Sequence, residues 1–463
     1  MNVTGNKYAL IVHVPEYCLS EMEWLCGVIF GEFLNVKFTL KPSAKAGFHL
    51  ESGEYILSMP DIFISGARSS NYAVMEEISY GTWNVNSIFE GISLCGDSLP
   101  VLFGTPGVSV EETGLSLRVD IFGTCFFMLS RYEEYASSLR DEHGRFLGEY
   151  SYAFKCGFLD RPLVDEYVEV LFHFMERAWP GMVRFPSGGA VKVSCDVDHP
   201  FDGAASGLVR LFSGVAADVI KRGFIVQPVK RILNGFFSQF GIYRFDPFDT
   251  FDWYMKTCEK AGKKVTFYFI SANTAGDLDG FYCINDSRIV KLMKDIVSRG
   301  HEIGVHGSYN SYNDSAQIST EKDILQALLR KSELDISIKE GRQHYLRWDV
   351  SFTPDVLNSA GLEYDGSGSF ADISGFRFGT SKTFTMWSWA ARSALSLKQR
   401  PLILMESSVI SSKYMGLGYS QEAYDLMSVL KERSLWRGDF SILWHNSHLS
   451  RKKDRDLFEL LVQ

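Results

Sequence analysis

Two aspartates and a histidine follow a short β-branched stretch in the sequence VKVSCDVDHP, residues 191–200. Side chains alternate between the two faces of an extended strand, so Asp196 and Asp198 project to the same side. Pro200 cannot donate to a sheet ladder and should end the strand. The two carboxylates are therefore expected at the carboxyl end of a strand, where α/β folds place active sites. By itself this pattern is equally typical of a polar loop after a core strand.

Further polar side chains follow three later apolar stretches. HEIGVH ends in His306, and GRQHYLRWD contains Arg342 and His344. SILWH ends in His445. If these strands lie parallel in one sheet, their carboxyl ends meet and all these side chains join the two aspartates. A histidine beside paired carboxylates is typical of a metal site. Alone, each of these residues is more often structural.

The elements that must position these residues are helices and strands that alternate along the second half of the chain. Helices that end in a glycine turn are followed by short apolar strands, and Asp286 and Thr320 are predicted to begin helices. Roughly six or seven such units predict a parallel sheet closed into a barrel. The segments that show the alternation, or that supply its later strands, are Glu259–Ile270, Val297–His306, Asn358–Gly368, Pro401–Met405 and Phe440–His445.

The chain has 463 residues, more than the roughly 250 to 300 at which a single core stops growing. Residues 180–189 are rich in proline and glycine, and we place a domain boundary there. The first domain, residues 1–186, is predicted to be α/β or α+β, because strands at Tyr8–Val14 and Val36–Leu40 flank a helix at Glu21–Leu34. The second domain is then residues 187–463.

The sequence assigns no chemistry to residues 1–186. A single helix is predicted over Val119–Tyr135, because this stretch is apolar and then charged. Its acidic end, SRYEEY at residues 130–135, and the segment DEHGRF at residues 141–146 could approach the cleft, but surface turns are the simpler interpretation.

Composition excludes several classes of protein. The net charge of -9 argues against a general nucleic-acid binder, because phosphate contacts need clustered Lys and Arg. The eight cysteines form no CxxC pair, so neither a zinc ribbon nor a redox motif is predicted. The N-terminal residues lack the pattern of a secretory signal, and no apolar run reaches the about 18 residues of a membrane span. We therefore expect a cytoplasmic location.

Residues 203–246 form a basic insertion. The part from Gly203 to Arg244 carries six Lys and Arg against one acid, Asp218, with apolar residues interleaved. Such a pattern predicts amphipathic helices. The simpler interpretation is a lid that packs on the barrel. The sharper one is peripheral contact with an anionic membrane face or with an anionic carrier-linked substrate.

The order of these motifs resembles the polysaccharide deacetylases of the NodB-homology type, carbohydrate esterase family four, over residues 187–463. The aspartate pair, GHEIGVHGSYN, RQHY and LWH correspond to successive motifs of that family. The resemblance implies a distorted (β/α) barrel and metal-dependent removal of an acetyl group from an N-acetylated sugar. A divalent metal, zinc by preference, would polarise the acetamide and lower the pKa of a bound water toward about 7.

The resemblance also implies a role for each residue. Asp196 would be the base that takes the water's proton, held by Arg342, and His445 would protonate the departing amine. Asp198 and His306 would be metal ligands. The metal, with a backbone N–H near the Arg342 loop, would hold the oxyanion.

One position departs from the family pattern, because Asn310 stands where a second histidine ligand belongs. Three outcomes are open. His344 supplies the third ligand; Asn310 or Ser308 completes an oxygen-rich site; or the metal is lost. In an extended strand His344 and Tyr345 cannot both face the cleft without a local kink.

Three functions are therefore carried forward. The first is a metal-dependent carbohydrate N-deacetylase, the second a saccharide-binding pseudoenzyme, and the third a hydrolase of a non-sugar C–N bond. A small closed cleft favours the third. An aromatic-lined groove favours a sugar, and the aromatic side chains expected near the mouth, of which at least half should pack in the barrel, are Tyr309, Tyr312, Tyr345, Trp348, Trp387, Trp389 and Trp444.

Overall fold

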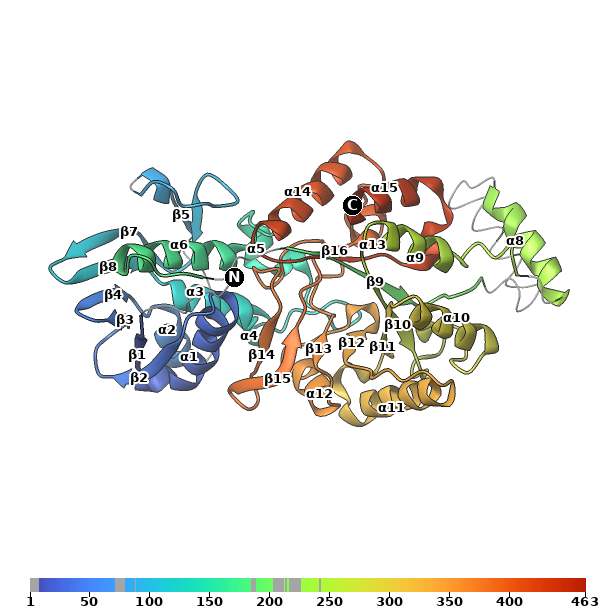
Figure 1. The fold of residues 1–463 in the computed structure, drawn as a ribbon, viewed down its shortest axis with the longest axis horizontal. Coiled ribbons are helices and arrows are strands. Elements are labelled where there is room, and N and C mark those ends of the chain that lie inside the picture. Colours follow the sequence, from blue (N-terminus) through green and yellow to red (C-terminus); the bar gives the residue numbers. More distant parts are fainter. Residues whose placement is uncertain are drawn as a thin grey trace.

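Two large sheets organise the molecule, one built from residues 10–119 and the other from residues 191–443. In the computed structural model they lie side by side along its longest axis (Figure 1). The predicted domain boundary at residue 186 lies outside the described part of the chain. The structure describes residues 8–70, 80–87, 89–184, 189–202, 212, 215, 226–240 and 243–463.

The first sheet is mixed and has the strand order β2-β1-β3-β4-β8-β7. Its buried residues, such as Val12 and Val14, contribute to one core with the helices that pack on it. β5 (Gly81–Trp83) and β6 (Leu99–Val101) form a separate pair. The main elements of this region are β1 (Leu10–Pro15), α1 (Leu19–Cys26), β2 (Phe38–Ser43), β3 (Phe48–Ser52), β4 (Tyr55–Met59), α2 (Phe63–Ser69), β7 (Gly104–Glu111), β8 (Gly114–Val119), α3 (Ile121–Leu129), α4 (Tyr132–Ala136), α5 (Tyr152–Lys155) and α6 (Leu163–Ala178).

The second sheet has nine strands in the order β14-β15-β13-β12-β11-β10-β9-β17-β16. Every neighbouring pair is parallel except β14 and β15. The central strands β9 and β10 are buried at nearly every position, as expected for parallel strands covered on both faces. The strands are β9 (Val191–Val197), β10 (Val265–Ile270), β11 (Glu302–Gly307), β12 (Glu340–Gln343), β13 (Tyr364–Asp365), β14 (Phe384–Ser388), β15 (Ser393–Gln399), β16 (Leu404–Met405) and β17 (Phe440–Leu443).

The predicted closed barrel is not shown. β14 and β16 are the two ends of the sheet, and no pairing among the described residues joins them. β14 instead turns back on β15 and packs against the first region: the indole N–H of Trp24 donates to Thr385 O (2.8 Å), and the rings of Trp24 and Trp387 lie 5.4 Å apart. The first region therefore covers the edge that a closed barrel would have paired.

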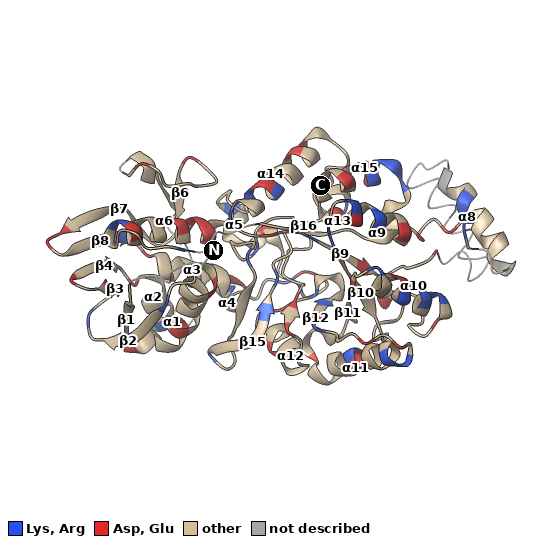
Figure 2. Cartoon of the chain, viewed as in Figure 1, with Lys and Arg blue, Asp and Glu red and all other residues tan. Residues whose placement is uncertain are grey.

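Helices follow the parallel strands, as the alternation predicts. Asp286 caps α10, since its carboxylate accepts from the Arg288 N–H. The predicted start at Thr320 is wrong: α11 begins at Ser315, capped by Asp314. Acidic and basic side chains mix on the outer helices α9, α14 and α15 (Figure 2). The helices are α9 (Phe251–Lys260), α10 (Ser287–Ser298), α11 (Ser315–Lys331), α12 (Thr353–Ser359), α13 (Glu406–Ile410), α14 (Gln421–Arg437) and α15 (Lys452–Val462).

The segment predicted as one helix over Val119–Tyr135 is broken at Arg131, which has a φ of 53°. Arg131 is fully buried and donates to Glu134 (2.7 Å). Glu134 also accepts two hydrogen bonds from Arg377 of the second region, at 2.9 and 2.5 Å. The acidic segment is therefore not a surface turn but a buried ion network between the two regions.

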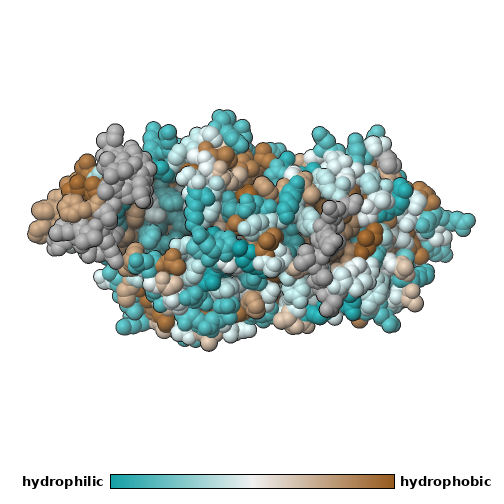
Figure 3. Space-filling model, turned by 180° about the vertical axis from the view of Figure 1, so that it is seen from behind, coloured by the Kyte–Doolittle hydropathy of each residue, from teal (hydrophilic) through white to brown (hydrophobic). Residues whose placement is uncertain are grey.

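Most of the basic insertion at residues 203–246 lies outside the described residues, and the predicted membrane contact stays a prediction. Its helix α8 (Val226–Phe237) is described. Figure 3 shows an apolar end of the molecule beside it. Within the described chain, every helix is too short or too polar to cross a membrane. The large apolar side chains exposed on α8 and the turn after it are Val229, Ile232, Phe236 and Phe240.

Candidate active site

Four of five successive parallel strands, β12, β11, β9 and β17, bring the predicted residues to one edge of the second sheet. Asp196 lies at the end of β9, with Asp198 just beyond it, and His306 lies at the end of β11. His344 directly follows β12, and His445 lies two residues after β17. Carboxyl ends of parallel strands meet at the same edge, and the side chains therefore converge although up to about 250 residues separate them.

Asp198, His306 and His344 form a compact cluster. One ligand atom from each lies within 4.8 Å of the others. Asp198 Oδ1 lies 3.2 Å from His306 Nε2 and 3.6 Å from His344 Nε2. Burial raises the pKa of Asp198, but the three neighbouring imidazoles outweigh it and hold that pKa well below its usual range.

Each imidazole of the cluster is oriented through its other nitrogen. His306 Nδ1 lies 2.8 Å from the backbone oxygen of Arg342, and His344 Nδ1 lies 3.1 Å from Asp279 Oδ1. Such outer partners fix the tautomer and present Nε2 to a metal. Sequence reasoning missed Asp279, which no strand end or motif marked.

The cluster fits a divalent metal. Asp198 Oδ1 and His306 Nε2 are buried, and although they lie 3.2 Å apart neither makes a hydrogen bond of good geometry. Buried polar atoms without partners are rare in folded proteins and call for an explanation such as an ion. Two imidazoles and one carboxylate are also the ligand set of many catalytic zinc sites, which keep a fourth position open.

Asp196 stands beside the cluster, held by a buried arginine. Arg342 Nη1 donates to Asp196 Oδ1 (2.9 Å) and to the Ser194 hydroxyl (2.9 Å), and its Nε donates to Gly366 O (2.8 Å). The other carboxylate oxygen of Asp196 lies 3.6 Å from His306 Nε2. The carboxylate is therefore fixed with one oxygen toward the cluster.

His445 faces the cluster from the end of β17, the strand paired with β9. Its Nε2 lies 3.4 Å from Asp198 Oδ2, and its Nδ1 lies 2.5 Å from Oε1 of the buried Glu406. Burial opposes the charged form of His445, yet Glu406 and Asp198 raise its pKa well above the usual range. His448 Nδ1 also contacts Glu406, at 2.9 Å. Glu406 was not predicted, although it directly follows the predicted strand Pro401–Met405.

The structure does not bring Asn310 to the cluster. Its amide nitrogen donates to Thr274 O (3.0 Å), and its oxygen accepts from Arg347 Nη1 (3.0 Å). The side chain is thus committed to other partners. Ser308 is likewise bonded to Glu321 through its hydroxyl. His344, and not Asn310, is the side chain that lies beside Asp198 and His306.

A local kink lets His344 and Tyr345 both face the cleft. Tyr345 and Leu346 have left-handed backbone angles, with φ of 63° and 50°. Both His344 and Tyr345 line a cavity of about 340 Å³ together with the cluster. The local kink, without which both side chains could not face the cleft, is therefore present.

Two further hollows adjoin the cavity that contains the cluster. A hollow of about 630 Å³ shares Arg145 and Tyr414 with it, and another of about 510 Å³ shares His199 and His448. Few aromatic side chains line the cavity itself, where Tyr345 and Tyr414 are the large ones. The expected tryptophans are buried in the core instead, namely Trp348, Trp387, Trp389 and Trp444.

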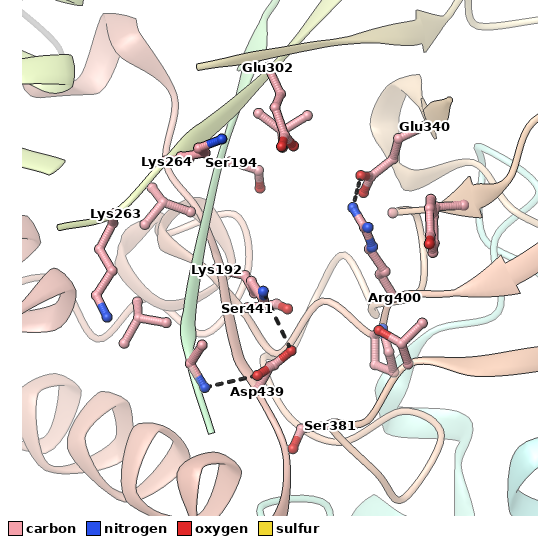
Figure 4. Close-up of a pocket in the computed structure, with 18 of the residues that line it drawn as sticks. Lys192, Ser194, Lys263, Lys264, Glu302, Glu340, Ser381, Arg400, Asp439 and Ser441 are labelled. Atoms are coloured by element: carbon pink, nitrogen blue, oxygen red, sulfur yellow. Dashed lines mark hydrogen bonds and ion pairs between the residues drawn. The ribbon is translucent and has the colours of Figure 1, made fainter. Parts of the chain in front are cut away.

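A larger cavity of about 700 Å³ lies at the amino ends of the same strands. Its acidic and basic side chains are largely paired, since Glu340 contacts Arg400 and Asp439 accepts from the Ala190 N–H at 2.8 Å (Figure 4). Arg342 separates this cavity from the cluster and lines its wall. Among the described residues no group of metal ligands lies there. The candidate metal-ligand cluster lies instead at the carboxyl ends of the strands.

Comparison with known proteins gives a family only for the first region. A family of unknown function (DUF7033) matches residues 10–180, less than half of the chain. No curated protein matches.

Three solved structures show a likeness at 14% identity. One, described as a polysaccharide deacetylase from Mycobacterium smegmatis, has a TM-score of 0.39 and is covered over 85% of its length by 60% of this chain. A polysaccharide deacetylase from Pseudomonas aeruginosa PAO1 has a TM-score of 0.31, with 45% of this chain covering 64% of it. Puue allantoinase also has a TM-score of 0.31, with 46% of this chain covering 65% of it. Such low TM-scores carry no argument about function, which must come from the geometry of the site.

Proposed function

We propose that this chain is a metal-dependent amide hydrolase that removes the acetyl group from an N-acetylated sugar. The observation that carries the proposal is the set of three ligand-like side chains, Asp198, His306 and His344, beside an arginine-held carboxylate and a glutamate-held imidazole. A hydrolase of this kind needs a metal, a base and an acid. The cleft offers a candidate for each.

The metal would be held by Asp198 and by the Nε2 atoms of His306 and His344. When bound there, a divalent cation such as zinc polarises the acetamide carbonyl and lowers the pKa of a water ligand toward about 7. The protein's own contribution is to keep both imidazoles in the tautomer that presents Nε2.

Asp196 would be the general base. Its oxygen that does not bind Arg342 faces the cluster, where the attacking water would lose its proton. Arg342 holds the carboxylate in place, and a carboxylate oxygen can accept the proton of a water.

His445 would be the general acid. Glu406 and Asp198 raise the pKa of His445 and so favour the protonated ring, and Glu406 fixes its orientation through Nδ1 (2.5 Å). The departing amine needs a proton because an amide anion is a poor leaving group. Asp196 lies at the end of β9 and His445 follows β17, the strand paired with it, and proton removal and proton delivery are assigned to these two different side chains.

The hollows that extend the cavity on both sides favour an extended substrate such as an oligosaccharide. The small volume around the cluster and the burial of the tryptophans favour the second candidate, a hydrolase of a small non-sugar C–N bond. We rank the sugar first, because the cavity and the two hollows that adjoin it together exceed what a small amide fills.

Amine release from N-acetylglucosamine oligomers tests the proposal, with a set of small linear and cyclic amides assayed in parallel. We expect activity on the oligomers that disappears with a chelator and returns with zinc. Activity on the small amides alone would select the second candidate. Oligomer binding without turnover by the metal-loaded protein would contradict both and leave a saccharide-binding protein.

A further inference from the structure

The backbone that follows His344 is strained. Tyr345 and Leu346 both adopt the left-handed region, which side chains bearing a Cβ occupy only at an energetic cost. Such conformations persist when surrounding contacts fix them. His344 directly precedes these two residues. The position of its Nε2 near Asp198 therefore depends on the contacts that fix the conformation of the turn.

The contact that holds the turn comes from the first region. Arg145 Nη1 donates to the backbone oxygen of Tyr345 (2.8 Å). Among the described residues the structure gives that oxygen no other hydrogen-bond donor. Arg145 is only 5% exposed, although it lies 200 residues away in the sequence. The segment DEHGRF is thus a wall of the cleft and not a surface turn.

Arg145 is itself held rigidly. Asp141 accepts from its Nε (2.9 Å) and its Nη2 (2.7 Å), a two-point contact with the planar guanidinium. The same carboxylate accepts from the backbone N–H groups of His143 and Arg145, at 2.9 and 2.8 Å. With two of its nitrogens tied to Asp141, the guanidinium presents the third to Tyr345.

Two further contacts dock the same segment on the loops of the site. Arg347 Nε donates to His143 O (2.8 Å), and His143 Nδ1 lies 3.0 Å from the hydroxyl of Tyr309. The His143 ring also lies 5.0 Å from the ring of Tyr345. Residues 141–145 therefore contact both the loop after β11 and the turn after β12.

We propose that Arg145 is a positioning residue of the metal site, which keeps the strained turn at residues 345–346 in the conformation that presents His344. The metal site of the second region is then incomplete without the first region, and this gives residues 141–145 a function. The inference rests on the proposed function in one respect, since it takes His344 to be a ligand.

The test uses the full chain with Arg145→Met, which removes the donor to Tyr345, and Arg145→Lys, which keeps the charge beside Asp141. The matched control is Arg140→Met: Arg140 pairs with Asp349 across the same contact between regions (2.9 Å) and does not touch the turn. Zinc affinity is measured by competition with a chromophoric chelator. Hydrogen exchange of amides 343–349 is measured on the metal-free proteins.

We expect Arg145→Met to weaken zinc binding about 10- to 100-fold, the usual effect of losing a residue that orients a ligand. Arg145→Lys should show a smaller loss, and Arg140→Met should stay within about threefold of the unchanged chain. Exchange at 343–349 should be faster in Arg145→Met than in Arg140→Met. A Co²⁺-loaded sample should show a changed visible spectrum in Arg145→Met alone.

A second substitution distinguishes a loss of positioning of His344 from a general loss of folded structure. Glycine adopts left-handed angles freely, so Tyr345→Gly should relieve the strain and restore most of the zinc affinity in the Arg145→Met background. No rescue, or equal zinc affinity and exchange in the Arg145 variants and the unchanged chain, would overturn the inference. The unchanged chain could bind no zinc while Arg145→Met still speeds hydrogen exchange at amides 343–349. That result would contradict the proposed function but would support the role of Arg145 in fixing the turn.

Discussion

Replacing His344 by alanine should cost the protein most of its zinc affinity. Zinc binding to four-ligand sites is worth about 10 to 16 kcal/mol, or roughly 3 to 4 kcal/mol per ligand. Since tenfold in affinity is about 1.4 kcal/mol, loss of one ligand corresponds to about 100- to 1000-fold. His344 is one of only three protein ligands in the cluster, and Asn310 is turned toward Thr274 and Arg347 and cannot take its place without breaking those bonds.

Two further variants provide comparisons for the loss of zinc affinity in His344→Ala. Asp279→Asn weakens the partner of His344 Nδ1 and should cost about 10- to 100-fold, whereas Asn310→Ala should stay within about threefold. Zinc affinity is measured by chelator competition on folded protein, checked by circular dichroism. The reasoning is refuted if His344→Ala binds zinc as tightly as the unchanged chain, or if Asn310→Ala loses more affinity than Asp279→Asn.

The remaining predictions concern proton transfer and stability. Asp196→Asn should keep the metal and lose turnover, because an amide cannot accept the water's proton; turnover near that of the unchanged chain would move the base elsewhere. Glu406→Gln removes a charge that raises the pKa of His445, so that pKa falls and the alkaline limb of the kcat profile moves to lower pH; an unmoved limb would exclude His445 as the acid. Glu134→Ala leaves the buried guanidinium of Arg377 without its carboxylate and Arg131 with Glu133 alone, and should cost about 3 to 5 kcal/mol in urea unfolding; a loss under about 1 kcal/mol would contradict a structural role for this network.

The convergence of Asp196, Asp198, His306 and His445 could be predicted from the sequence because each follows an apolar strand. Once strands alternate with helices, a parallel sheet brings their carboxyl ends together whatever the loop lengths. The sequence also showed that His344 and Tyr345 could both face the cleft only with a local kink, since side chains alternate along a strand, but it did not show that the kink is there.

The partners of these residues could not be predicted. Asp279 and Glu406 reach the histidines through tertiary contacts, and their own neighbourhoods resemble ordinary loop and helix starts. The burial of Glu134 could not be predicted for the same reason, because its ion partner Arg377 lies 243 residues away. Strand count suggested closure into a barrel, yet the packing of β14 on the first region depends on Trp24 and Trp387, which no local pattern links.

Metal content tests the central claim most directly. The purified full chain and its Asp198→Ala and His306→Ala variants are loaded with zinc, dialysed and measured by elemental mass spectrometry. We predict one zinc per chain in the unchanged protein and almost none in either variant, because each removes one of the three ligands of this cluster. Equal zinc in all three proteins, or none in the unchanged chain, would contradict the assignment of this cluster as a metal site.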